Sequence, residues 1–183
     1  MDAERSARLE QLLDRQEIIE RLNAFSRGMD RFDRDIYLSA FHPGAEMAAG
    51  PFVGTVEECY DWAMPMHAAG QKATHHNLLN INIDFDGDTA HTETYYLFVG
   101  RNADDSNWIA GGRYVDRFEK RDGAWKIALR TNSIEWSGIV PTMPLPFSDV
   151  PDIYGNGAPA RGLDDPSYQR PLLNRRSRHI PGG

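Results

Sequence analysis

The stretch WIAGGRYVDRFEKRDGAWKIALRTNSIEW, residues 108–136, decides the fold of this chain. Residues 108–120 and 124–136 are each rich in β-branched and aromatic residues, and an Arg-Asp-Gly turn at 121–123 separates them. An Asp-Gly turn of this length suits the backbone twist of two antiparallel strands. The stretch therefore predicts a long β-hairpin.

The segment before it predicts a second hairpin of the same design. Its strands span 74–85 and 89–99, and an Asp-Gly-Asp turn at 86–88 joins them. Two hairpins in succession predict an antiparallel meander of four long strands, which twist and curl around whatever covers one face. The glycine pair at 111–112 predicts a bulge or a bend in the third of these strands.

Three helices are predicted ahead of the hairpins. Apolar residues recur at three- and four-residue steps over 7–25, Asp33 can cap a short second helix, and Thr55 opens a third. Pro65 is expected to kink or end that third helix, and a short strand is expected at 46–49. The predicted fold class is α+β, a cone-shaped α+β barrel in which the helices pack against a strongly curved, mainly antiparallel sheet.

The chain divides into a domain and an extension. Residues 1–140 are predicted to form the cone-shaped domain, and residues 141–183 form a Pro- and Gly-rich C-terminal extension with little periodicity. With 183 residues, of which 40% are hydrophobic and 26% are charged, the chain can bury one ordinary core without metals or disulfides.

Composition and motifs exclude several functions. A net charge of -7 argues against a nucleic-acid partner, which needs a basic face. No apolar run approaches the roughly 20 residues that span a bilayer, and no signal peptide is recognisable, so no membrane contact and a cytoplasmic location are expected. Cys59 is the only cysteine, so no intramolecular disulfide is expected. The histidines do not show His-Glu-x-x-His spacing, so no metal site is expected. Phosphate loops, dinucleotide fingerprints and nucleophile elbows do not occur, so no cofactor is expected.

An aspartate and a histidine are the first candidates for chemistry. Asp30 lies at the exit of the first helix, where it serves either as a solvated or capping residue or as a group at the rim of a pocket. His75 and His76 begin the first long strand, and adjacent strand residues point to opposite faces, so one of them faces inward. Counting in steps of two places His76 on one face with residues 78, 80, 82 and 84.

The last long strand adds a charged candidate. Arg130 interrupts an apolar alternation, so it either faces solvent on the sheet surface or meets an anion inside. Tyr96 and Tyr114 lie in the middle strands, where each either packs or turns its hydroxyl into a cavity.

These residues occur in an order that resembles a known superfamily. The motifs are Gly-Met-Asp-Arg at 28–31, His76 ahead of Asn-Ile-Asn-Ile-Asp-Phe at 80–85, and Gly-Gly-Arg-Tyr at 111–114 followed by Arg-Asp-Gly-Ala-Trp-Lys at 121–126. Over residues 7–139 the chain resembles the SnoaL-like, nuclear-transport-factor-two-like proteins, which include ketosteroid isomerase and scytalone dehydratase. Within them it is most similar to the branch of hexachlorocyclohexane dehydrochlorinase and bile-acid dehydratase.

The resemblance implies a site and a chemistry. Asp30 would orient and charge His76 as the general base, and Arg130 would support the departing anion. Phe25 stands where the dehydrochlorinase has a lysine and Met47 where the family has a pocket tryptophan, so water rather than halide is the expected leaving group. The substrate-binding residues implied are Phe25, Met47, Tyr96 and Tyr114.

Two other functions remain open on the sequence alone. The main hypothesis is a cofactor-independent, dehydratase-like lyase acting on a small apolar cyclic substrate. One alternative is a noncatalytic small-molecule binder or assembly subunit, because the same fold supports many roles. The other is an isomerase or a polyketide cyclase, in which nothing leaves. The resemblance also implies a homodimer or a homotrimer.

Overall fold

The computed structural model describes residues 2–178 and has three helices ahead of and between six strands. The last five residues of the predicted extension, 179–183, lie outside the described residues. The elements are α1 (Ala3–Arg31), α2 (Arg34–Ser39), β1 (Phe41–Ala49), β2 (Phe52–Thr55), α3 (Val56–Gly70), β3 (Gln71–Asp86), β4 (Thr89–Asn102), β5 (Asn107–Arg121) and β6 (Ala124–Val140).

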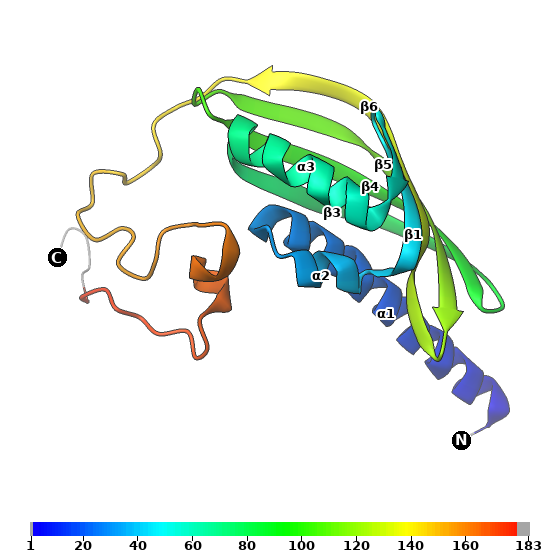
Figure 1. Ribbon diagram of the computed structural model, residues 1–183. Helices are drawn as coiled ribbons and strands as arrows, with labels where there is room; N and C mark the ends of the chain where they lie inside the picture. Colours follow the sequence, from blue (N-terminus) through cyan, green and yellow to red (C-terminus); the bar gives the residue numbers. More distant parts are fainter. Residues whose placement is uncertain (1, 179–183) are drawn as a thin grey trace.

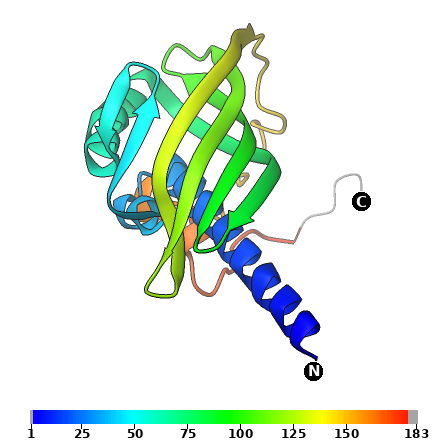
Figure 2. The same ribbon diagram turned by 90° about the vertical axis from the view of Figure 1, so that its right-hand side faces the viewer.

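The strands form one sheet in the order β2-β1-β6-β5-β4-β3. Strands β3 to β6 make the predicted antiparallel meander. Strand β1 pairs with β6 in parallel, and β2 pairs with β1 in antiparallel. The sheet bends around α1 and α3 without closing into a complete barrel (Figures 1 and 2). The predicted α+β class with helices against a strongly curved, mainly antiparallel sheet is confirmed.

Each helix begins directly after a capping side chain, and α1 begins at Ala3, ahead of the predicted start at residue 7. Asp2 accepts the backbone N–H of Arg5 at 2.8 Å, and Asp33 accepts that of Ile36 at 3.0 Å. Thr55 and Glu58 form a capping box at the start of α3.

Pro65 was expected to kink or end α3, and it does not end the helix. The helix continues through it to Gly70. Proline has no backbone N–H, so the carbonyl of Asp61, four residues earlier, loses its helical hydrogen bond. Both residues lie on the exposed side of α3, where water can replace that bond.

Two register shifts change which residues face inward. One lies in β3 between Leu78 and Ile81. Because of it, His76 and Leu78 share the inner face with Ile81 and Ile83, and not with residues 80, 82 and 84 as step-two counting predicted. The other lies at the glycine pair 111–112, where an irregularity was predicted, but the extra residue, Glu135, is in β6.

The core fills the space between α1 and the concave face of the sheet. Its largest fully buried apolar side chains are Ile18, Leu22, Tyr37, Phe118, Trp125 and Ile127.

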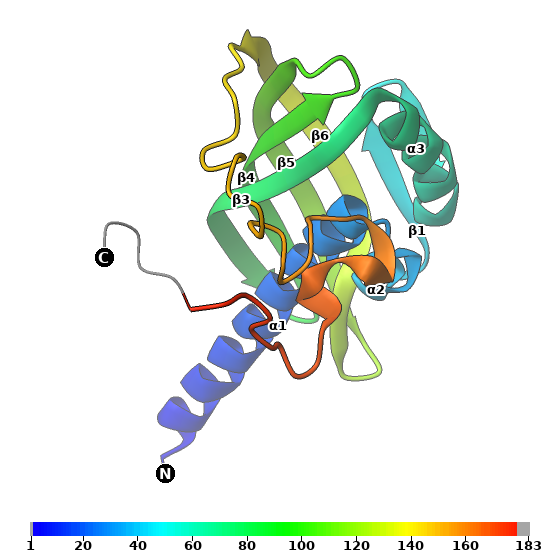
Figure 3. The same ribbon diagram turned by 90° about the vertical axis from the view of Figure 1, so that its left-hand side faces the viewer.

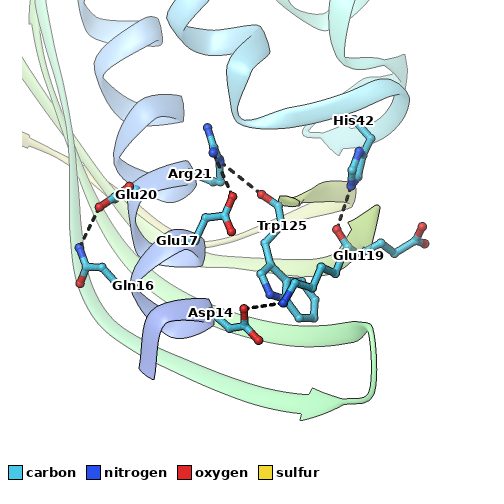
Figure 4. Close-up of polar contacts among 9 residues, drawn as sticks. Asp14, Gln16, Glu17, Glu20, Arg21, His42, Glu119 and Trp125 are labelled. Carbon is cyan, nitrogen blue, oxygen red and sulfur yellow. Dashed lines mark hydrogen bonds and ion pairs between the residues drawn. The ribbon is translucent and has the colours of Figure 1, made fainter. Parts of the chain in front are cut away.

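Polar contacts hold the middle of α1 to the β5-β6 hairpin (Figure 4). The ammonium group of Lys120 donates to a carboxylate oxygen of Asp14 at 2.8 Å, and Arg21 Nε donates to the carbonyl of Trp125 at 3.2 Å. These contacts fix the helix along the sheet, so its C-terminal turns, which carry Asp30, reach the opposite end of the concave face.

The extension packs against the C-terminal end of α1 and the N-terminal end of α2 (Figure 3). It contains two 3-10 turns, Gly162–Asp164 and Pro166–Tyr168. The Tyr168 hydroxyl donates to a carboxylate oxygen of Asp33 at 2.7 Å, and Arg31 Nη1 donates to the carbonyl of Ala160 at 3.0 Å. The extension therefore lies on the helix end that bears Asp30.

Asp165 connects several parts of the extension to one another and to α1. Its buried carboxylate accepts the backbone N–H groups of Ala160 and Ser167, each at 2.9 Å, and lies 3.7 Å from the Arg31 guanidinium. Burial raises its pKa, but these hydrogen bonds and the Arg31 charge outweigh it and hold the pKa at about 2. Asp165 therefore stabilises the docked extension above the ordinary carboxyl pKa of 3.8, and this stabilisation is lost as the pH falls from there to about 2.

We expect Asp165→Ala to loosen the extension by about 2 kcal/mol, the scale of hydrogen bonds to a charged group. Hydrogen–deuterium exchange should show faster exchange over residues 156–170 and unchanged exchange in the sheet. The exposed neighbour Asp164 provides the control, Asp164→Ala. Equal exchange in the two variants would contradict the assignment.

Candidate active site

A cavity of about 200 Å³ lies between the helices and the concave face of the sheet. Aromatic and apolar side chains make up most of its wall. They include Phe25 and Met29 from α1, Met47 from β1, Ala63 from α3, Phe98 from β4 and Trp108 from β5. Such a wall suits an apolar ring compound and strengthens the few polar interactions inside it.

Six of the seven residues predicted for the site line this cavity. They are Phe25, Met47, His76, Tyr96, Tyr114 and Arg130. The seventh, Asp30, contacts His76. The fold thus brings together residues from α1, β1, β3, β4, β5 and β6.

Asp30 holds His76 by two hydrogen bonds. Asp30 Oδ1 lies 2.7 Å from His76 Nδ1, and Asp30 Oδ2 accepts the backbone N–H of His76 at 2.9 Å. The side chains are 13% and 8% exposed, respectively. A carboxylate oxygen only accepts, so Nδ1 carries the proton, and Nε2 is the free basic nitrogen of the neutral ring. This geometry suits a general base whose protonated form is stabilised by a carboxylate.

The close approach of α1 and α2 sets the position of Asp30. A Cβ atom at Gly28 would lie 2.4 Å from the backbone nitrogen of Tyr37, so only glycine allows α2 to fold back at this distance. This tight turn leaves Asp30, two residues later, directed at β3.

Arg130 is fully buried in an ion pair with Asp116. Arg130 Nε and Nη2 donate to the two oxygens of Asp116, each at 2.7 Å. Its guanidinium carbon lies 4.1 Å from the ring centre of Phe25 and 4.3 Å from that of Tyr114. Burial lowers the pKa of Arg130, and the Asp116 carboxylate more than reverses this, so the pKa lies above its usual value and the group stays charged.

One nitrogen of Arg130 is left out of the ion pair with Asp116. Nη1 is buried and has no partner among the described residues. An unpaired buried donor costs about 1–3 kcal/mol, which an acceptor on a ligand could recover. The residue predicted to meet an anion thus meets one from the protein, Asp116, and also lines the cavity.

Two stacked tyrosines form another part of the wall. The rings of Tyr96 and Tyr114 lie 4.4 Å apart at an angle of 18°. Burial raises the pKa of each, so both are neutral phenols at ordinary pH. Met47 is buried and lies 3.3 Å, sulfur to sulfur, from Cys59.

His67 and Asp116 are site residues that the sequence analysis gave no role. His67 lies in the last turn of α3 and lines the cavity, with its ring centre 6.2 Å from that of His76. A signal for Asp116 was present, because it interrupts the inward-facing series Tyr114 and Phe118. No comparable signal marks His67, whose position depends on where α3 lies.

The described residues give no metal site or membrane-spanning helix. Within 2–178, no group of three or more His, Cys, Asp and Glu side chains could hold a metal ion. No helix in the same range is both long and apolar enough to cross a bilayer.

Comparisons with known proteins place the chain in a family and a fold. The model of the SnoaL-like domain family matches residues 10–131, about two thirds of the chain. A hexachlorocyclohexane dehydrochlorinase, LinA type 2, has 18% identity and a TM-score of 0.69, covering 76% of this chain and 99% of its own. LinA type 3 from Novosphingobium barchaimii has 18% identity and a TM-score of 0.68, with coverages of 74% and 95%.

A third similar structure is a scytalone dehydratase-like protein from Novosphingobium aromaticivorans. It has 22% identity and a TM-score of 0.63, covering 75% of this chain and 97% of its own. A search of curated proteins found no significant match. At these identities the structural likeness extends to the fold.

Proposed function

Since the chain belongs to the SnoaL-like domain family, we propose that it is a cofactor-independent lyase of the dehydratase kind. Its substrate is a small apolar cyclic compound that loses a proton and a leaving group, water. The observation that carries this proposal is the Asp30 and His76 pair at an aromatic cavity that also presents a buried arginine. Similar folds in dehydrochlorinase and dehydratase-like proteins support the reaction class.

The proposed reaction begins with His76. Its Nε2 takes a proton from a carbon next to a carbonyl, and the C–H electron pair moves toward the carbonyl oxygen. Asp30 stabilises the imidazolium that forms, and Arg130 Nη1 donates to the oxygen that becomes negative. The electrons then form the carbon–carbon double bond as hydroxide leaves, and the proton on His76 completes the water molecule.

The positions of the base and the guanidinium support this division of roles. The ring of Phe25 lies between them in the wall, 6.1 Å from the His76 ring centre and 4.1 Å from the Arg130 guanidinium carbon. A flat substrate placed over this wall would meet the base at one edge and the donor at another. Holding both groups in one geometry is itself a large part of catalysis.

The proposal is tested with a panel of ring ketones that carry a hydroxyl group one carbon beyond the acidic C–H. The expected result is formation of a conjugated ketone, measured by ultraviolet absorbance, with loss of one water in the mass spectrum. A conjugated product of unchanged mass would instead support the isomerase alternative. Saturable binding without any product across the panel would support the noncatalytic binder.

A further inference from the structure

His67 gives the cavity a second imidazole. It lies in the last turn of α3, and its ring is nearly perpendicular to that of His76, at 83°. Both rings also contact Phe98, with centre distances of 6.1 Å for His67 and 4.9 Å for His76. The two imidazoles therefore lie on the same side of the cavity, around one phenyl ring.

A neighbouring amide fixes the tautomer of His67. Nδ1 lies 2.5 Å from the side-chain oxygen of Gln71. An amide oxygen accepts and cannot donate, so Nδ1 carries the proton in the neutral ring and Nε2 carries the lone pair. His76 has the same arrangement, with Asp30 in place of Gln71. Each histidine thus leaves Nε2 as an acceptor.

The two histidines differ in the charge of the group that their Nδ1 contacts. His67 contacts the neutral amide of Gln71, and His76 contacts the carboxylate of Asp30. Burial lowers the pKa of His67 and outweighs the bond to Gln71, which raises it, and the positive charge of Arg161 lowers it further, so that the pKa lies below its usual value. Arg161 comes from the extension, and its Nη1 donates to the His67 carbonyl at 3.2 Å. His67 is therefore a neutral acceptor at neutral pH.

We propose that His67 selects the substrate of this cavity, because its Nε2 accepts a hydrogen bond from an O–H or N–H group on the bound ring compound. The inference rests on the proposed function, since the same ring compound must lie against His76. It adds a requirement for a donor group that the lyase chemistry does not itself impose. A ring without a donor leaves the His67 acceptor desolvated and unpaired, which disfavours its binding.

Two probes of matched shape test this inference. One is 2-naphthol, which carries an O–H donor, and the other is 2-methoxynaphthalene, which does not. Isothermal titration calorimetry on the full chain should show about tenfold tighter binding of 2-naphthol, the effect of one hydrogen bond of about 1.4 kcal/mol. Equal affinities in the wild type would overturn the inference and leave the lyase proposal intact. Binding of neither probe would also overturn the inference, whereas the lyase proposal depends on product formation in the ring-ketone panel.

Variants then show whether His67 or His76 causes the tighter binding of 2-naphthol. His67→Phe should abolish it, and His67→Gln should keep part of it, because the glutamine oxygen still accepts. His75→Phe is the matched control, since His75 lies exposed on the other face of β3. His76→Asn should keep the preference for 2-naphthol while losing turnover. A preference that disappears in His76→Asn and survives in His67→Phe would overturn the inference.

A measurement on the wild type covers the case in which His67→Phe does not fold. In nitrogen-15 spectra, 2-naphthol should shift the Nε2 resonance of His67, assigned from its absence in His67→Gln. The methoxy probe should not shift it. A resonance that responds equally to both probes, or to neither, would contradict the proposed hydrogen bond.

Discussion

His76→Ala is expected to lower the turnover number about 10²- to 10⁴-fold, the usual contribution of a general base. The imidazole supplies the only free basic nitrogen that a carboxylate activates at this cavity within residues 2–178, because Asp30 Oδ1 lies 2.7 Å from His76 Nδ1. The measurement is the initial rate of water loss from the ring ketone that the wild type turns over. The Michaelis constant should change little, since the apolar wall stays in place.

Asp30→Asn removes the negative charge of Asp30 and keeps nearly the same side-chain shape. The amide oxygen can still accept the backbone N–H of His76, but the group no longer stabilises an imidazolium. Its turnover should fall by a comparable factor in the same assay. His75→Ala, on the exposed face of the same strand, should keep the wild-type rate. If Asp30→Asn and His76→Ala both fold and both retain full activity, the pair is not the catalytic base.

The sequence contained enough information for the meander and for most of the cavity wall. Asp-Gly turns at 86–88 and 121–123 placed both hairpins, because their backbone preferences are local. The helix end at Asp30 followed from the three- and four-residue period of α1. The assignment of His76 as its partner came from a resemblance to a family, since periodicity left the inward histidine undecided.

Long-range pairing and strand irregularities limited the prediction. Strand β1 pairs in parallel with β6, about 80 residues later in the chain, and no local pattern specifies such a partner. In the β5-β6 hairpin, simple counting back from the turn pairs Asp116 with Leu129. The register shift beside Phe118 moves its partner by one residue, to Arg130. The buried ion pair therefore depends on an irregularity that alternation does not reveal.

That ion pair leads to the largest expected change in stability. Asp116→Ala should lower the free energy of unfolding by about 3–5 kcal/mol, because it leaves a buried guanidinium without its counter-charge. Both side chains are at most 1% exposed, so water cannot replace the lost carboxylate without opening the core. For a domain whose total stability is about 5–15 kcal/mol, this is a large fraction. Urea unfolding followed by circular dichroism measures it.

A double variant separates stability from function. Asp116→Leu with Arg130→Met removes both charges and fills similar space, so it should be more stable than Asp116→Ala, since no buried charge is left unpaired. The double variant should nevertheless lose turnover, because Arg130 Nη1, which has no partner among residues 2–178, would no longer meet the substrate oxygen. A stable double variant with the wild-type rate would limit Arg130 to a structural role. An Asp116→Ala variant as stable as the wild type would mean that water reaches the guanidinium.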